Sequence, residues 1–141
     1  MSDLSQASLT IENRLSELAR VERWLADLMG RWDVSDRTVF ALDLVINEAV
    51  TNVINHAYSD TLTHPITISL TDAATRIVVE IIDDGAAFDP LAAPPMEPGQ
   101  DLAHASIGGR GIHLIKSYSA EHDYRRVAGR NHLTLAIPKV N

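Results

Sequence analysis

Two runs of β-branched residues constrain the fold of this 141-residue chain more than any other feature. They occupy residues 66–70 (ITISL) and 76–82 (RIVVEII), and the five residues TDAAT separate them. Two short runs with a brief polar connection are typical of a β-hairpin. Further strand-like pieces lie at residues 7–11, 120–127 and 132–137. The chain is therefore expected to build a sheet that is mostly antiparallel.

The segments outside these strands have a helical period. Between Ile11 and Met29, apolar residues recur at steps of three and four, which places them on one helical face. Ser35 is a suitable N-cap for a second helix that ends near Tyr58. Because both helices precede the hairpin, helices and strands do not alternate along the chain. This order predicts the α+β class: a two-layer sandwich in which helices cover one face of a mostly antiparallel, or mixed, β-sheet.

The composition narrows the range of functions. Hydrophobic residues make up 45% of the chain and charged residues 22%, which indicates one globular domain over residues 1–141. The net charge of −7 argues against nucleic-acid binding, because that needs clustered Lys and Arg. The lack of cysteine excludes disulfides and thiolate catalysis. Neither a signal peptide nor a membrane span is visible in the sequence, so we expect a cytoplasmic protein with no membrane partner.

The second helix carries a narrow polar stripe. Glu48, Asn52 and His56 recur every four residues, so they share one face of a helix that is otherwise largely apolar. A solvated helix face would explain the stripe without any function. Against that interpretation, the rest of the helix is too apolar to present a broad polar face to water, and asparagine is a poor helix former. The stripe is therefore a candidate site.

Two segments that contain glycine are further candidates. Asp83-Asp84-Gly85 follows a strand and is either an ordinary turn or an acceptor carboxylate at a pocket. Residues 86–107 are rich in proline and alanine, and so long an irregular stretch is usually functional or disordered. The sequence GGRG at 108–111 then opens a helical pattern, and is either a flexible connection or a phosphate-binding turn.

The order of these motifs is more specific than any one of them. EAVTNVINHAY (48–58), IIDDGAAFDP (81–90) and GGRGIHLIKSYS (108–119) resemble the three boxes of the Bergerat, or histidine-kinase-like, ATPase fold, which DNA gyrase and histidine kinases share. More narrowly, they resemble the small anti-sigma-factor serine kinases of bacterial partner-switching systems. The resemblance covers roughly residues 7–138. We expect no dimerisation, sensor or phosphoacceptor-helix domain to accompany it, and this expectation favours the stand-alone kinases over histidine kinases.

This resemblance implies roles for the matching residues that would bind Mg²⁺, transfer the proton and bind adenine. Asn52 would hold the Mg²⁺ that bridges the phosphates of ATP, since a carboxamide oxygen suits that cation. Glu48 would be the general base that accepts the proton of a partner's serine. Asp83 would accept a hydrogen bond from the adenine amino group, and Gly85 would let the base lie close to the backbone.

The same resemblance assigns the phosphate end of the site. Gly109, Arg110 and Gly111 would hold the phosphates through backbone N–H groups and one positive charge. Residues 86–110 would form the lid over ATP or ADP. These assignments make the long proline-rich stretch intelligible.

The chain departs from the family pattern at two places. Ala87 stands at the last position of the usual D-x-G-x-G. The family's last strand often begins with Gly-Thr, whereas this chain reads NHLT at 131–134; Thr134 is a candidate replacement, but its register leaves it outside the expected site residues. His56 matches no role in the pattern.

The expected function is that of an ATP- and Mg²⁺-dependent protein-serine kinase and anti-sigma factor. Its partners would be an anti-sigma-factor antagonist, which receives the phosphoryl group, and a sigma factor, and the family commonly forms homodimers. The alternative is a nucleotide-dependent module that sequesters a partner without phosphoryl transfer. A third interpretation, an α+β interaction domain with coincidental motifs, has to explain three matches in the correct order.

Overall fold

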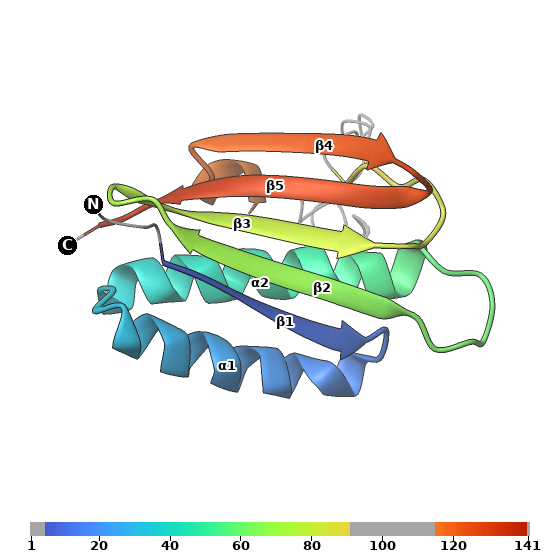
Figure 1. Ribbon diagram of the computed structural model, residues 1–141, viewed down its shortest axis with the longest axis horizontal. Helices are drawn as coiled ribbons and strands as arrows, with labels where there is room; N and C mark the ends of the chain where they lie inside the picture. The colour runs from blue at the N-terminus through green and yellow to red at the C-terminus, as the bar shows by residue number, and fades with distance from the viewer. Residues whose placement is uncertain (1–4, 91–114, 141) are drawn as a thin grey trace, which may run out of the picture.

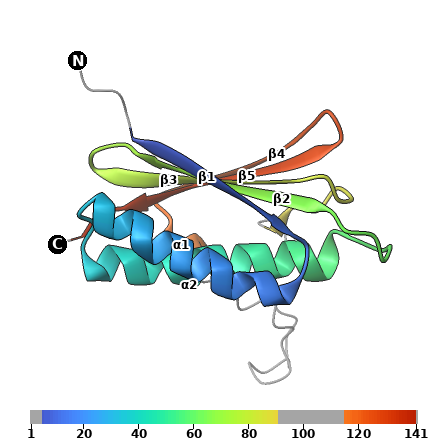
Figure 2. The same cartoon turned by 60° about the horizontal axis from the view of Figure 1, so that its bottom comes forward.

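The computed structural model describes residues 5–90 and 115–140, which form a five-stranded sheet with two long helices on one face (Figure 1, Figure 2). The strand order is β1-β2-β3-β5-β4, and all neighbours pair antiparallel. The strands are β1 (Gln6–Glu12), β2 (Pro65–Asp72), β3 (Arg76–Asp83), β4 (Glu121–Val127) and β5 (Arg130–Pro138). The helices are the 3-10 turn η1 (Leu15–Glu17), α1 (Leu18–Arg31) and α2 (Asp36–His56). The predicted α+β two-layer fold is confirmed.

The predicted hairpin forms the centre of the sheet. β2 and β3 pair with Ile68 opposite Ile81, and Ala74 turns the chain between them with a φ of 68°. Alternate residues of both strands face the helices and are buried: Ile66, Ile68, Leu70, Ile77, Val79 and Ile81. The period of two in the sequence therefore reflects one covered face and one open face.

The first helix begins later than the sequence pattern predicts. Ile11 belongs to β1, where it pairs with Ile66, and its side chain is only 2% exposed. The strand continues to Glu12, and α1 begins at Leu18. A strand and a helix both accept an apolar residue at this boundary, and pairing with β2 decides between them. The strand over residues 7–11 is confirmed, whereas the helix start at Ile11 is wrong.

α2 is the central helix of the covered face. Ser35 caps it as predicted, because its Oγ accepts a hydrogen bond from the Thr38 N–H at 3.3 Å. The apolar side chains of α2 are buried beneath the sheet: Leu42, Val45, Ile46, Ala49, Val50 and Val53. The end of α2, the end of β3 and the start of β5 meet at one end of the molecule (Figure 1). Within the described residues, no helix is long and apolar enough to cross a membrane.

Candidate functional site

The polar stripe of α2 contains a buried asparagine. Asn52 is 3% exposed, and its Nδ2 has no hydrogen-bond partner in the part of the chain that the structure describes. Buried polar groups nearly always have a partner, so an orphaned one indicates a place where a ligand or water binds. Glu48, one helical turn earlier, is half-buried, and His56, one turn later, is exposed. The stripe is therefore not a solvated helix face, because its middle residue lies inside the protein.

A buried carboxylate ends β3. Asp83 is 3% exposed, and its Oδ1 accepts hydrogen bonds from the Gly85 N–H at 2.9 Å and from Asn131 Nδ2 at 2.8 Å. Burial raises the pKa of Asp83 above its ordinary value, while the hydrogen bonds from Asn131 and Gly85 act in the opposite direction because they favour the ionised form. The strand end thus presents a fixed acceptor, which a donor group on a ligand can meet.

Asn131 organises the surroundings of Asp83. It lies opposite Asp83 in the register of β3 and β5 and is 3% exposed. Its Nδ2 also donates to the Ala86 carbonyl at 2.8 Å, and its Oδ1 accepts from the Phe88 N–H at 3.3 Å. Asn131 is not among the site residues predicted from the sequence, because it comes two positions after Gly129 and has the local pattern of a turn. The available signal was the missing Gly-Thr at the start of the last strand.

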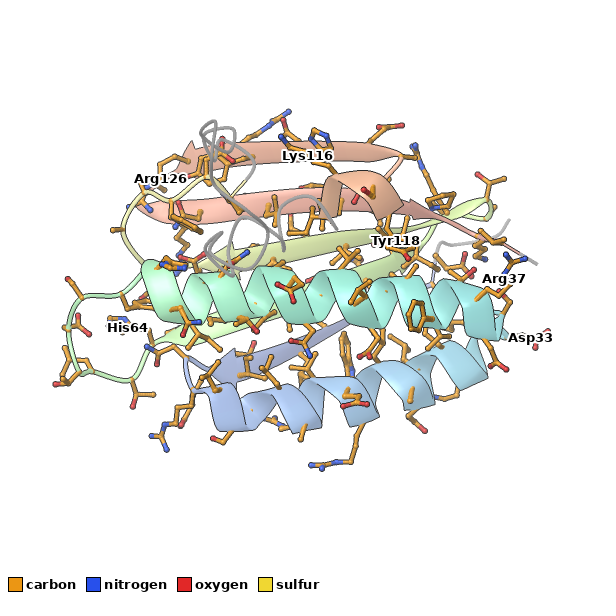
Figure 3. The ribbon with its side chains drawn as sticks, turned by 180° about the vertical axis from the view of Figure 1, so that it is seen from behind. Asp33, Arg37, His64, Lys116, Tyr118 and Arg126 are labelled. Atoms are coloured by element: carbon orange, nitrogen blue, oxygen red, sulfur yellow. The ribbon has the colours of Figure 1, made fainter. Side chains whose placement is uncertain are left out.

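The outer strand β4 contributes two more side chains to this network. The Tyr124 hydroxyl donates to Asn131 Oδ1, and Arg126 Nη1 donates to the same oxygen at 3.1 Å. Arg126 Nη1 also donates to the Gly85 carbonyl at 2.7 Å. Arg126 lies at the end of the molecule where α2 ends (Figure 3). β4 therefore braces the turn after β3 from the edge of the sheet.

Gly85 packs directly against the end of α2. A Cβ at this position would lie 2.6 Å from the carbonyl oxygen of Ala57 and 2.7 Å from its Cβ. The same carbonyl accepts a hydrogen bond from the Ala86 N–H at 2.8 Å. Since the obstacle is backbone, glycine is the residue that fits. The close approach seen at Gly85 is thus to α2, and it holds the turn against the helix that carries Asn52.

His56 and Thr134, which the sequence left without an assigned role, have definite surroundings. The ring of His56 stacks on Phe88, with centroids 5.5 Å apart and an interplanar angle of 29°. Thr134 lies between the buried Leu133 and Leu135, so it is on the open face of the sheet, away from the helices. Asn131 therefore occupies the position that faces the buried carboxylate at the end of β3, and Thr134 does not.

A second polar cluster supports the turn from the connection between α2 and β2. The Tyr58 hydroxyl donates to Asp84 Oδ1 at 3.1 Å, and its ring stacks on His64 with centroids 4.5 Å apart. The His64 Nε2 lies 2.8 Å from Asp60 Oδ1, and its Nδ1 lies 3.4 Å from Asp84 Oδ2. The hydrogen bond between His64 and Asp60 raises the pKa of His64 and lowers that of Asp60. Burial raises the pKa of Tyr58, and the charges of Asp83 and Asp84 add to the effect.

The phosphate end of the expected site lies outside the described residues. This holds for Gly109, Arg110 and Gly111 and for most of the expected lid at 86–110. The described start of that segment, residues 86–90, carries the stacked Phe88 and ends at the buried Pro90. The roles assigned to the glycine-rich turn and to the lid stay predictions.

The described residues fit a nucleotide with a divalent cation. The ionised carboxylate of Asp83 can accept hydrogen bonds but cannot donate one, which matches the exocyclic amino group of adenine. Asn52 offers a buried carboxamide, and Mg²⁺ prefers oxygen ligands of this kind. Glu48 lies on the same helix face one turn away, and its carboxylate can accept a proton.

Comparisons with known proteins identify the family and agree with the fold. A family model described as the histidine kinase-like ATPase domain matches residues 11–137. Serine/threonine-protein kinase BtrW from Bordetella bronchiseptica is 39% identical over 114 residues, which cover 79% of this chain and 79% of that protein. The match includes most of both proteins, so it extends well beyond the short motifs.

Solved structures share the fold at low sequence identity. The RsbU and RsbW domains of Rv1364c from Mycobacterium tuberculosis match 96% of this chain with a TM-score of 0.66 and 14% identity. The blue-light activated histidine kinase EL346 from Erythrobacter litoralis matches 88% with a TM-score of 0.59 and 21% identity. This chain spans 32% of the first solved chain and 41% of the second, and at such identities the likeness concerns the fold alone.

Proposed function

The chain belongs to the family of histidine kinase-like ATPase domains, which makes it a nucleotide-binding domain, and we propose that it is an ATP-dependent protein-serine kinase. Its substrate would be a small anti-sigma-factor antagonist. It would bind a sigma factor when that antagonist is phosphorylated, and it would form homodimers. Similarity to a named serine/threonine-protein kinase along 79% of both chains supports the proposal.

One structural observation carries the proposal. Two polar side chains are buried at the same end of the fold, and within the described residues no hydrogen bond joins them to each other. Asn52 and Asp83 are each 3% exposed, and Asn52 keeps an orphaned amide nitrogen within the described residues. The hydrogen bond from the Ala86 N–H to the Ala57 carbonyl holds the turn after Asp83 on the last turn of α2. Burying such groups costs stability, so their retention indicates a ligand.

In this proposal, each described site residue binds one part of Mg-ATP. Asp83 accepts the adenine amino group through Oδ2, because Oδ1 already accepts from Gly85 and Asn131. Asn52 holds the Mg²⁺ through its carboxamide oxygen. The phosphates are held by Gly109, Arg110 and Gly111, and residues 86–110 close over them.

Glu48 is the proposed general base. Mg-ATP supplies the phosphoryl group. The Glu48 carboxylate takes the proton of the partner's serine hydroxyl while the serine oxygen forms a bond to the γ-phosphorus. The bond from the γ-phosphorus to the oxygen that bridges to the β-phosphate breaks, and ADP keeps that electron pair. Since Glu48 and Asn52 are one helical turn apart, the base and the cation ligand share one helix face.

Nucleotide binding is tested by thermal melts of the purified chain with Mg-ADP, Mg-ATP and Mg-GTP. A ligand at a hundredfold excess over its Kd stabilises the folded state by about 2.7 kcal/mol. We expect adenine nucleotides to raise Tm by several degrees and Asn52→Ala to remove the shift. Asn55→Ala, which deletes an exposed carboxamide from the same helix, is the matched control and keeps the shift. No shift with any nucleotide at millimolar concentration would contradict the proposal.

Phosphoryl transfer is tested on the co-purified partner by mass spectrometry. Glu48→Gln should lower phosphoserine formation by about 10²–10⁴-fold, because the base is lost, and should keep the nucleotide-dependent Tm shift. Glu80→Gln, on β3, serves as the control and transfers normally. Normal transfer by Glu48→Gln means that the base is assigned to the wrong residue. A Tm shift without phosphoserine in the wild type supports the alternative, a nucleotide-dependent module that sequesters its partner.

A further inference from the structure

An exposed apolar groove lies beside the first turns of α2. Phe40 is 63% exposed, Val140 is 43% exposed and Tyr118 is 38% exposed. Phe40 comes from α2, Val140 from the chain after β5 and Tyr118 from the helical turn at 115–118. Together they line one groove of about 430 Å³. Large apolar side chains that gather in one exposed hollow mark an interaction surface more often than scattered ones do.

The groove continues on the other side of Phe40. A second hollow of about 240 Å³ shares Asp36 and Phe40 with the first and lies between α1 and α2. Its apolar lining comes from Leu25, Ala26 and Val39. We call the two hollows together the Phe40 groove, because this ring stands between them.

The rim of the Phe40 groove is acidic. Glu22, Asp36 and Asp43 all line it. Burial and the negative charge of Glu22 both raise the pKa of Asp43, so the two carboxylates repel each other. Within residues 5–90 and 115–140, no ion pair compensates the charge of Glu22 or of Asp43. Arg37, which also lines the groove, is itself engaged in another interaction.

We propose that the Phe40 groove binds a basic amphipathic segment of a protein partner. Its apolar side chains pack beside Phe40 and Tyr118, and its Lys or Arg side chains lie over Glu22 and Asp43. Aromatic residues in such hollows are common energetic centres of interfaces. A cation placed between two repelling carboxylates relieves a cost that the free protein carries, which gives both affinity and charge specificity.

The same charges exclude other occupants. A second copy of the chain in a two-fold interface would set acidic rim against acidic rim, since both sides of such an interface use the same patch. An anionic membrane or a nucleic acid would also meet like charge. The acidic rim therefore selects a basic protein segment.

The groove is separate from the nucleotide site. Phe40 precedes Asn52 by 12 residues on α2, which corresponds to about 18 Å along the helix. Figure 3 shows Arg37 at the start of α2, with Tyr118 toward that half of the helix, and His64 and Arg126 at its other end. A partner that packs on Phe40 therefore lies more than three helical turns from Asn52, and the inference does not depend on phosphoryl transfer.

The test measures fluorescence anisotropy with a labelled amphipathic helix that has leucine on one face and lysine on the other. The full chain should bind this peptide in a salt-dependent manner and should bind a matched leucine–glutamate peptide far more weakly. Phe40→Ser and the double variant Glu22→Gln/Asp43→Asn should each weaken binding by at least about tenfold.

Two variants at other places are the controls. Leu62→Ser removes an equally exposed apolar side chain from the α2–β2 connection, and Glu121→Gln/Asp123→Asn removes two charges from β4. Both should bind the lysine peptide as the wild type does. Equal binding by all variants, or no binding by the wild type, overturns the proposal. The ADP-dependent Tm shift, measured on the same proteins, reports the nucleotide site independently and should persist in the groove variants.

Discussion

At the residue scale, the candidate site depends on a carboxylate that the fold holds at a cost. Burial raises the folded pKa of Asp83 above its ordinary value of 3.8. The folded state therefore binds this proton more tightly than the unfolded state does. The resulting stabilisation is fully present below the unfolded pKa and is lost as pH rises through the folded pKa. At neutral pH the ionised Asp83 lowers the free energy of unfolding, which is a common feature of binding sites.

Asp83→Asn should separate stability from binding. Asparagine keeps an Oδ1 acceptor for Gly85 and Asn131 and carries no charge. Without nucleotide, Tm at pH 7 should equal or exceed that of the wild type, and the difference should disappear below about pH 4, where aspartate is protonated as well. The ADP-dependent shift should be lost. Asp123→Asn, an exposed control on β4, should change neither quantity. A lower Tm of Asp83→Asn at pH 7 would show that hydrogen bonds to the ionised form outweigh its burial.

At the element scale, the connection between α2 and β2 is held by one imidazole. His64 stacks on Tyr58 and bridges Asp60 and Asp84, while its backbone exchanges two hydrogen bonds with Asn13. Asp84 is the neighbour of the buried carboxylate of β3, so this connection also fixes the turn of the candidate site. The arrangement makes the stability of the connection sensitive to pH.

His64→Phe should remove that pH dependence. The pKa of His64 is raised by Asp60 and Asp84, so its stabilisation is complete below the unfolded pKa of about 6.5 and is lost as pH rises through the folded pKa. The pKa of Asp60 is lowered, so its contribution is present above 3.8 and is lost as pH falls. The difference in Tm between wild type and variant should be larger at pH 5.5 than at pH 8.5. Phenylalanine preserves the stack on Tyr58, and a difference independent of pH would contradict the titration of His64.

At the scale of the whole molecule, the end of the chain is fastened to the start of the central helix. Thr38 is 1% exposed, and its Oγ1 accepts from the Val140 N–H at 2.8 Å and donates to the Val140 carbonyl at 3.2 Å. The Ser35 hydroxyl donates to the same carbonyl. These contacts join the helix layer to the sheet across 102 residues of sequence. They also place Val140 in the Phe40 groove.

Thr38→Val should destabilise the whole fold. The substitution keeps the shape of the side chain but removes the two hydrogen bonds that the buried Thr38 hydroxyl makes with the backbone of Val140, which together contribute about 1–3 kcal/mol. Urea unfolding should show a lower midpoint with an unchanged slope. Thr67→Val is the matched control, because it removes one hydroxyl of the Thr10–Thr67 pair on the open face of the sheet, and it should change stability by less than about 0.5 kcal/mol. Equal effects of the two variants would contradict the role of Thr38.

Local patterns were sufficient to predict most of the fold. The period of two predicts the hairpin of β2 and β3, and the period of 3.6 predicts the buried face of α2. Ser35 predicts the cap of α2, because the capping hydrogen bond joins residues only three positions apart. The start of α1 was not predictable, because Ile11 fits the period of a strand and that of a helix equally well. Its pairing with Ile66 decides that Ile11 belongs to a strand.

The candidate site divides in the same way. Sequence alone determined Glu48, Asn52, Asp83 and Gly85 as candidates, since their types and spacing repeat a known motif order. Tertiary structure alone decided that Asn131 faces Asp83, because the pairing of β3 with β5 joins residues 48 positions apart. It also decided that the Phe40 groove exists, since its walls come from segments that meet only in the folded chain. Long-range contacts leave no period or local composition in a sequence, and for that reason neither could be derived from it.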